Sequence, residues 1–278
     1  MVACRKTGSH KKNIPIITLL TDFGLQDEYI GVMKGVILSM NPDVRVVDIT
    51  HYIPRHDVRR AALVLATSFG YFPKGSIHVA VVDPGVGGER KIICLKQEGH
   101  FFLAPDNGLL TMVIKDEKVQ KVCMVSNDKY FLEPVSDTFH GRDIFAPVAA
   151  HLSKGVDMGR IGREISPEDL LRLDIEVPFV SAGVELVGTI VSVDRFGNLV
   201  TNIDQATFER FKHHAKSAQV MVRLGRFTIK GVSKSYDAVK VGSPLAIFGS
   251  RRLLEISLNQ GDAQGHFKAK IGQTVKIT

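Results

Sequence analysis

Residues that could act on a ligand follow four apolar runs of the sequence, at the point where each run ends. Each of the four segments carries an aspartate, and they are TDFG (21–24), DITH (48–51), DPG (83–85) and PDNG (105–108). In an open α/β sheet, ligands bind outside the carboxyl ends of the strands, so side chains at this edge can share one site. A single aspartate there is an ordinary turn or helix-capping residue. Four of them favour a polar binding site at one edge of a predicted sheet.

The stretch VVDPGVGGER, residues 81–90, has an unusual density of glycine for one of these strand ends. Glycine lets the backbone approach a ligand closely. The spacing is not GxGxxG, and no Gly-Lys-Ser/Thr follows, so a phosphate-binding loop is only weakly supported. A second polar cluster, TFHGRD at 138–143, precedes an apolar helical segment, where Asp143 can cap the helix and His140 can be a structural histidine. The residues alone leave the role of both segments open.

The elements that must position these residues follow two different patterns. In the first part of the chain, short apolar runs alternate with segments of helical period, namely EYIGVMKGVILSMNP, VRRAALVLATSFGYF, NGLLTMVIKDE and DIFAPVAAHLSKG. This alternation predicts an α/β domain with a mostly parallel sheet. After the polar segment 165–178 the period becomes two, which predicts an all-β domain, either a sandwich or a barrel. The predicted domains are residues 1–182 and 183–278, with residues 1–13 as a flexible tail.

Charge is distributed unevenly between these two parts. The chain has 278 residues and a net charge of +7, and the excess of lysine and arginine lies after residue 182. From Arg210 to Tyr236 there are several cations and no acid, a feature of some nucleic-acid surfaces. The cations alternate with apolar residues, however, as in strands with one solvated face, and no aromatic series accompanies them. We therefore expect no nucleic-acid partner.

Other features of the sequence limit its location and its metal chemistry. The apolar runs are far shorter than the ~20 residues that a membrane-spanning helix needs, so no membrane segment is expected. The cationic N-terminus has no apolar stretch like that of a secretory signal, which favours a cytoplasmic location. The cysteines, Cys4, Cys94 and Cys123, are scattered and form no CxxC pair. This argues against a disulfide framework and a zinc site, and we expect no metal and read Cys94 and Cys123 as core residues.

Six ordered motifs resemble the S-adenosyl-L-methionine (SAM) hydroxide adenosyltransferases, relatives of the fluorinase and chlorinase enzymes. The motifs are TDFG, DITH, VVDPGVG followed by an arginine, PDNGLL, TFHGRD and DRFGNLVTNI, and the resemblance covers roughly residues 14–278. The resemblance implies an N-terminal α/β domain and a C-terminal β-barrel. It also implies a homotrimer in which SAM lies between the N-terminal domain of one subunit and the C-terminal domain of its neighbour. SAM is then the substrate, and no cofactor is expected.

The resemblance assigns the catalytic roles to Asp83, Arg90 and His140, which in the hydroxide-using enzymes surround the attacking water. The halide-using relatives carry different residues at the aspartate and histidine positions. The fluorinase also has a long insertion where this chain has only the short interval 91–104. Both differences favour water over halide as the nucleophile.

The resemblance assigns the substrate contacts to residues of both domains. Asp22 matches the carboxylate that holds the ribose diol, and two hydroxyls can donate to one carboxylate. Phe139 matches a position that packs near the ligand, and His56 matches one that holds an aromatic residue in the fluorinase. The other matched positions lie at the methionine group (Asp194, Ser250 and Arg251) and on the adenine side (Phe196, Asn198, Asn259 and the backbone near Gln260). Leu258 stands where the fluorinase has an arginine, so the contacts of this strand with the adenine edge stay open.

The function implied by the resemblance is hydrolysis of SAM to adenosine and L-methionine, by attack of an activated water or hydroxide on the ribose C5′. Two alternatives from other classes remain open. One is a metal-dependent nucleoside hydrolase, because TDFGLQDEY loosely resembles the aspartate-rich opening of those enzymes, although their adjacent aspartate pair is missing. The other is a non-catalytic protein that binds SAM or adenosine and leaves it intact.

Overall fold

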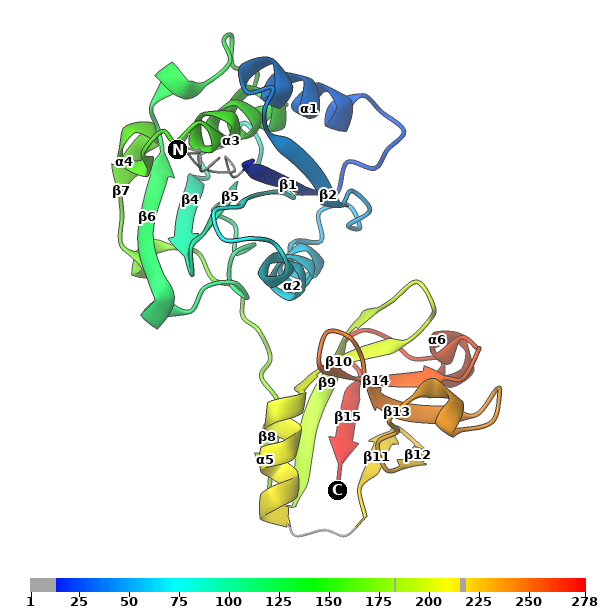
Figure 1. The fold of residues 1–278 in the computed structure, drawn as a ribbon. Coiled ribbons are helices and arrows are strands. Elements are labelled where there is room, and N and C mark those ends of the chain that lie inside the picture. Colours follow the sequence, from blue (N-terminus) through cyan, green and yellow to red (C-terminus); the bar gives the residue numbers. More distant parts are fainter. Residues whose placement is uncertain (1–13, 183, 216–218) are drawn as a thin grey trace, which may run out of the picture. The chain divides into compact units, whose positions relative to one another are not determined.

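The computed structural model describes residues 14–182, 184–215 and 219–278, and the chain divides into two compact units, Met1–Leu173 and Asp174–Thr278 (Figure 1). Residues 1–13, predicted as a flexible tail, lie outside the described residues together with Cys4. The division falls within the polar segment 165–178, where the sequence pattern changes. The first strand after this segment, β8 (Phe179–Ser181), pairs with β9 (Glu185–Val193) and is therefore part of the second unit.

The first unit contains a mixed sheet with the strand order β2-β1-β3-β5-β4-β6-β7. Its strands are β1 (Ile16–Thr21), β2 (Arg45–Thr50), β3 (Ile77–Val81), β4 (Ile92–Gln97), β5 (His100–Pro105), β6 (Val119–Val125) and β7 (Gly162–Glu164). Strands β2, β1, β3 and β5 run parallel, whereas β4 is antiparallel to β5 and β6, and β7 to β6. The predicted α/β domain with a mostly parallel sheet is confirmed.

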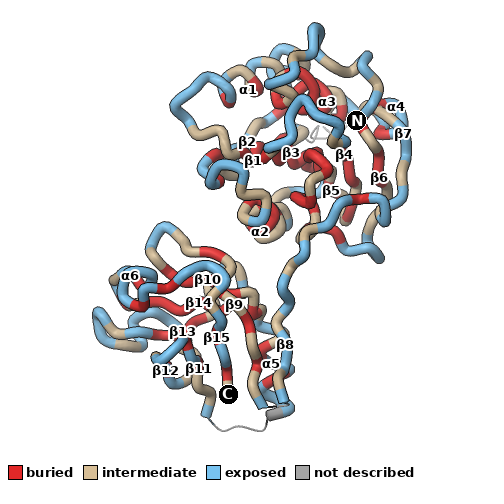
Figure 2. The backbone as a smooth tube through the Cα atoms, turned by 180° about the vertical axis from the view of Figure 1, so that it is seen from behind, coloured by how far each residue is buried: buried red, intermediate tan, exposed pale blue. Residues whose placement is uncertain are grey.

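Helices pack on both faces of this sheet, and they are α1 (Tyr29–Met40), α2 (Val58–Ser68), α3 (Ala146–Ser153) and the short α4 (Met158–Ile161) (Figure 1). Helices α1 and α3 contact each other on the face where Ile17 and Leu19 of β1 are buried. Helix α2 packs with Leu20 on the other face, because successive strand residues point to opposite sides. The buried residues consequently form two apolar layers, one on each face of the sheet. Figure 2 shows the buried positions of the strands in red. Cys94 and Cys123 lie in one of these layers, as predicted.

One expected helix is absent. The segment NGLLTMVIKDE, residues 107–117, has helical spacing but forms successive turns after β5. Gly108 has a φ of 89°, and the Thr111 N–H donates to the Gly108 carbonyl in a tight turn. This geometry prevents a regular helix from starting here. The apolar residues Leu109, Leu110 and Val113 are nevertheless buried. The periodicity therefore reflects packing against the sheet, and the helical interpretation of this segment was wrong.

The second unit is a nearly closed antiparallel β-barrel, which confirms the barrel implied by the resemblance. Its strand order is β12-β11-β15-β9-β10-β14-β13, and the remaining bounds are β10 (Leu199–Asp204), β11 (Met221–Leu224), β12 (Phe227–Lys230), β13 (Pro244–Phe248), β14 (Leu253–Leu258) and β15 (Thr274–Ile277). A bridge between Ser233 and Ile247 brings the chain after β12 to β13, so the two ends of the sheet approach each other. Strand β9 alternates between buried and partly exposed residues along its whole length.

Two helices complete the second unit, α5 (Gln205–Ala215) and α6 (Ala263–Phe267). The basic residues Arg223 and Lys230 are exposed on strands whose neighbours Val222 and Ile229 are buried, which is the alternation expected of one solvated face. Across the described ranges of both units, no helix has the length and apolar character needed to cross a membrane.

Candidate active site

The carboxyl end of β3 carries an ion pair formed within the glycine loop, which we define as residues 81–90. Strand β3 and Val82 are buried, and the chain then turns through a bond from Val86 N–H to the Asp83 carbonyl at 3.2 Å. The turn brings Arg90 back onto Asp83. Arg90 Nε donates to Asp83 Oδ1 at 3.1 Å and to Oδ2 at 2.9 Å, and Nη2 donates to Oδ2 at 2.7 Å. Both side chains are largely buried, with exposed fractions of 4% for Asp83 and 12% for Arg90.

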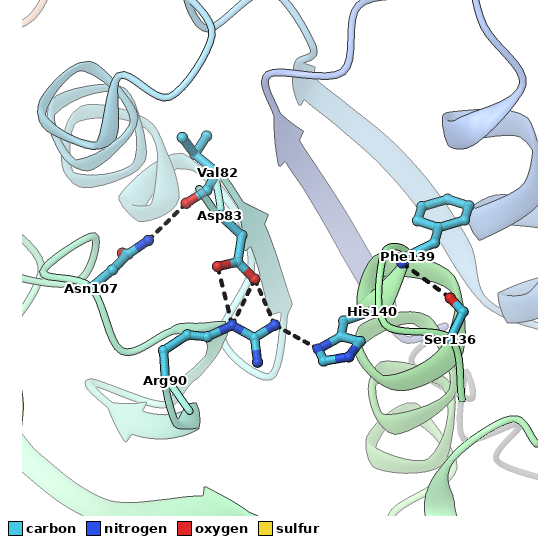
Figure 3. A network of polar contacts seen from close by, with 7 residues as sticks. All are labelled: Val82, Asp83, Arg90, Asn107, Ser136, Phe139 and His140. Carbon is cyan, nitrogen blue, oxygen red and sulfur yellow. Dashed lines mark hydrogen bonds and ion pairs between the residues drawn. The ribbon is translucent and has the colours of Figure 1, made fainter. Parts of the chain in front are cut away.

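His140 joins this ion pair from a distant part of the chain (Figure 3). Arg90 Nη2 lies 2.6 Å from His140 Nδ1. A guanidinium group has donors only, so Nδ1 accepts this bond and the neutral ring carries its proton on Nε2. Burial lowers the pKa of His140 below its usual range, and the charge of Arg90 lowers it further, although Asp83 acts in the opposite direction. The site therefore holds a neutral imidazole with one N–H group free to donate.

Gly87 explains why the loop needs glycine. Its φ is 78°, a conformation that side chains other than glycine rarely adopt, and a Cβ atom there would lie 2.2 Å from the carbonyl oxygen of Asp137. The glycine loop therefore contacts the histidine segment, which we define as residues 132–140, at backbone distance. This contact joins the two parts of the chain that carry Arg90 and His140.

Asp143 holds the histidine segment in place. It is fully buried within a π-helical turn, Gly141–Phe145, that leads into α3. Its Oδ2 accepts from Ser136 N–H at 2.9 Å and from Ser136 Oγ at 2.8 Å. Ser136 Oγ in turn accepts from Phe139 N–H at 3.1 Å, a bond drawn in Figure 3. Burial raises the pKa of Asp143, but the bonds from Arg142 and Ser136 outweigh it, and the net shift is downward. Asp143 thus fixes the loop before the helix rather than capping the helix end.

The four aspartates at the strand ends do not converge on one ligand site. Asp48 pairs with Lys34 at 2.6 Å and lies 3.1 Å from His51, and Asp106 is buried and accepts from Leu171 N–H at 2.9 Å. These two aspartates therefore stabilise the fold. In the PDNG motif it is Asn107 that supports the glycine loop, because its Nδ2 donates to the Val82 carbonyl at 2.8 Å (Figure 3).

Asp22 lies at the same sheet edge as Asp83, because Thr21 of β1 is in register with Val81 of β3. Its Oδ2 accepts from the backbone N–H of His56 at 2.9 Å, and no described residue donates to Oδ1. His56 has a φ of 63° and an exposed side chain, so its backbone is the part that contacts Asp22. A carboxylate with one free oxygen is suited to accept hydrogen bonds from hydroxyl groups.

Phe139, which matches a position near the ligand, is packed in an aromatic cluster. Its ring lies 6.1 Å from the ring of Phe23 and 5.0 Å from that of Tyr29, measured between centroids. Tyr29 and Phe23 come from the segment that follows Asp22. The first unit therefore carries an aromatic cluster, a carboxylate with one free oxygen and the Asp83–Arg90–His140 network on segments that follow its strands.

The remaining six predicted contacts line one cavity of about 880 Å³ in the second unit, and they are Asp194, Phe196, Asn198, Ser250, Arg251 and Asn259. Asp194 closes the turn that shapes one wall, since its oxygens accept from Phe196 N–H, Asn198 N–H and Asn198 Nδ2, each at 2.9 Å. Phe196 is 77% exposed, which leaves its ring free to contact a planar ligand. Leu258 lines the same cavity with an aliphatic side chain.

Sequence reasoning missed several residues that build these sites. Ser136 and Asn107 support the two loops through hydrogen bonds to backbone groups, which no spacing in the sequence indicates. Tyr236 and Glu255 line the cavity of the second unit although no motif contains them. For Glu255 the only signal in the sequence is a charged residue within the apolar strand segment LLEISL. In the structure this residue is 6% exposed. Among the described residues, no group of three or more His, Cys, Asp or Glu is placed to hold a metal ion.

Comparison with known proteins gives a consistent match along the chain. Residues 17–162 match the profile described as SAM hydroxide adenosyltransferase N-terminal domain, and residues 188–276 match the corresponding C-terminal domain. A relative from Thermus thermophilus, named (R)-S-adenosyl-L-methionine hydrolase, is 34% identical over 268 residues, which cover 94% of this chain and 98% of the relative. A protein of the same name from Methanocaldococcus jannaschii is 38% identical over 71% of both chains.

More distant and structural matches agree with this. A fluorinase from Actinoplanes is 27% identical and covers 95% of this chain and 97% of its own length. A crystal structure of an uncharacterized conserved protein from Thermotoga maritima superposes with a TM-score of 0.85 at 38% identity, over 94% of this chain and 99% of that one.

Proposed function

Because this chain belongs to the SAM hydroxide adenosyltransferase family, we propose that it hydrolyses SAM to adenosine and L-methionine. Relatives named (R)-S-adenosyl-L-methionine hydrolase match it over most of its length. The observation that carries the proposal is the contact of Asp83, Arg90 and His140 around one buried ion pair at the end of β3. These are the three residues that the resemblance assigns to the attacking water.

The reaction needs a positioned nucleophile more than it needs an acid. The water oxygen attacks the ribose C5′, and the C5′–S bond breaks with its electron pair left on sulfur. Methionine then departs as a neutral thioether, and one proton of the water is released. Because the sulfonium charge is lost in this step, the leaving group needs no protonation. Holding the reactants in line can lower the activation barrier by ~7–11 kcal/mol.

The contacts within the network suggest a different role for each of Asp83, Arg90 and His140. Asp83 is the acceptor for a water proton, but three bonds from Arg90 already occupy much of its acceptor capacity. We therefore assign Asp83 first to orienting the water and second to taking its proton. Arg90 fixes the carboxylate and His140 in one arrangement. His140 supplies the Nε2–H donor, which can bind the water oxygen and support hydroxide character as the proton leaves.

Substrate binding is divided between the two units in this proposal. Asp22 receives the ribose hydroxyls on its free oxygen, and Phe139 with its aromatic neighbours contacts the nucleoside. The cavity of the second unit receives the methionine group at Asp194, Ser250 and Arg251, and the adenine at Phe196, Asn198 and Asn259.

We also propose the homotrimer implied by the resemblance, in which each site draws these contacts from two subunits. Light scattering of the purified protein tests the mass of the assembly.

The proposal is tested by incubating the purified protein with SAM in EDTA, without halide, and following adenosine and methionine by chromatography. Hydrolysis gives both products in equal amounts. A nucleoside hydrolase would instead release a free base from added nucleosides and require a metal ion. A SAM-binding protein without activity would leave SAM intact. Added chloride or fluoride provides a further comparison, since the appearance of a 5′-halogenated nucleoside in place of adenosine would make halide the nucleophile.

A further inference from the structure

A carboxylate that no motif contains lies in the cavity of the second unit. Glu255 is on β14, where Leu254 and Ile256 point into the barrel core, so that its own side chain points to the opposite face. It is 6% exposed and lines the cavity together with Asp194 and Arg251. Gly249 leaves room for it, because a Cβ at that position would lie 2.0 Å from Glu255 Oε1.

The hydrogen bonds of Glu255 leave this carboxylate poorly satisfied. Its hydrogen-bond partner is the Tyr236 hydroxyl, which donates to Oε2 at the long distance of 3.4 Å, and no described residue donates to Oε1. Burial raises the pKa of Glu255, and the nearby charge of Asp194 raises it further, although Arg251 opposes both effects. A buried carboxylate beside a second one is costly unless a cation compensates it.

Arg251 carries the complementary feature in the same cavity. Its Nη1 is buried and has no hydrogen-bond partner. Although the charge of Arg251 acts on Glu255, the two side chains form no ion pair with each other. The cavity therefore contains an unsatisfied carboxylate and an unsatisfied guanidinium donor that the protein does not pair with each other. A ligand that bears an ammonium and a carboxylate on one carbon atom would satisfy both.

We propose that Glu255 binds the α-ammonium group of the substrate's amino-acid moiety, alongside Asp194, and makes the enzyme selective for sulfonium substrates that carry this group. The inference rests on the proposed function and extends it. Both oxygens of Asp194 already accept hydrogen bonds within the turn at 194–198, so Glu255 has the carboxylate oxygen that is more available to the ligand. Arg251 Nη1 binds the carboxylate of the same moiety.

The test compares SAM with two analogues, S-adenosyl-4-methylthiobutanoate, which lacks the amine, and decarboxylated SAM, which lacks the carboxylate. We expect Glu255→Gln to lower kcat/KM for SAM by roughly 10- to 100-fold, mainly through KM, the range for losing a hydrogen bond to a charged group. The same variant should change kcat/KM for the desamino analogue by less than about threefold, so the preference for the amine collapses. Preference for the carboxylate should persist. Glu185→Gln, which removes a carboxylate of β9 that pairs with Lys276 on the surface, is the matched control and should leave both preferences intact.

The outcomes separate this inference from the proposed function. No adenosine from the wild-type protein would refute the hydrolase itself. An active wild type whose Glu255→Gln variant loses the same factor on SAM and on the desamino analogue would make Glu255 a structural residue and overturn the inference alone. Glu255→Asp keeps the charge with a shorter side chain and should retain part of the preference. If Glu255→Gln does not fold, a reduced amine preference in a folded Glu255→Asp variant still supports the inference, and an unchanged preference refutes it.

Discussion

Replacing Asp83 by asparagine changes the chemistry of the network with little change in its size. In the wild type, the carboxylate accepts three hydrogen bonds from Arg90, at 2.7 to 3.1 Å. An amide has one acceptor oxygen, so its NH₂ group would face a guanidinium donor, and one of these contacts must be lost. Arg90 would also lose its counter-charge while remaining 12% exposed.

The expected effect on catalysis follows from this geometry. A positioned proton acceptor contributes typically 10²–10⁴-fold to a rate. Because Arg90 occupies much of the Asp83 carboxylate, we expect the lower half of this range, a fall in kcat of about 10²–10³-fold, or about 3–4 kcal/mol in the barrier. KM for SAM should change by less than about threefold, because Asp83 is assigned to the water and not to SAM.

Steady-state rates of adenosine formation give kcat and KM, and thermal melting checks that the variant is folded. Asp116→Asn is the matched control, since Asp116 is an exposed aspartate of the same unit that pairs with Arg172 outside the network. The reasoning is refuted if Asp83→Asn retains kcat within about threefold of the wild type, or if it loses SAM binding as strongly as turnover, since the second result marks a structural residue.

Three further predictions concern the surroundings of the network and the core. His140→Ala should lower kcat less than Asp83→Asn does, with SAM binding retained. In the wild type, kcat should stay constant around neutral pH and fall only in acid, below the usual histidine pKa, because the pKa of His140 is lowered. Protonation of His140 would place a proton on the nitrogen that faces Arg90. Gly87→Ala should lower both the melting temperature and kcat, because its Cβ would lie 2.2 Å from the Asp137 carbonyl, whereas Gly85→Ala, with its nearest atom at 3.7 Å, should fold as the wild type does. The buried pair His78 and His100, whose ring nitrogens are 3.2 Å apart, should make the first unit acid-sensitive. Burial lowers the pKa of His78 from 6.5 to about 3, so its contribution to stability is complete above pH 6.5 and is lost as the pH falls towards 3. Between pH 7 and pH 5 the loss should be about 2 kcal/mol, measured by urea unfolding, and His78→Phe should reduce it.

The sequence predicted the two architectures because their periodicities are strong. The uniformly buried strand β3 and the alternating strand β9 are the two kinds of pattern that distinguish a covered parallel sheet from a barrel wall. The segment 107–117 misled this reasoning, because its spacing of apolar residues is helical while Gly108 at φ 89° favours turns. Periodicity reports which residues are buried, and local backbone conformation decides how.

The site was predictable where a motif carries its own chemistry and unpredictable where contact depends on folding. Asp83 and Arg90 are close in sequence, and the structure joins them to His140 across fifty positions, as expected from the resemblance. Ser136 escaped prediction because it acts on the backbone of the histidine segment, and Asp143, predicted as a possible helix cap, instead holds Ser136. Glu255 escaped it because a charged residue in an alternating strand is read as solvent-facing until its neighbours are known.

The source of the oxygen in the adenosine product tests the central claim most directly. Purified protein is incubated with SAM and EDTA in water enriched in heavy oxygen, and adenosine and methionine are analysed by mass spectrometry. Direct attack of a water held by Asp83, Arg90 and His140 on C5′ predicts that the label appears at the 5′ oxygen of adenosine and that methionine stays unlabelled. Adenosine without the label, or release of adenine with the ribose still attached to sulfur, would contradict the account.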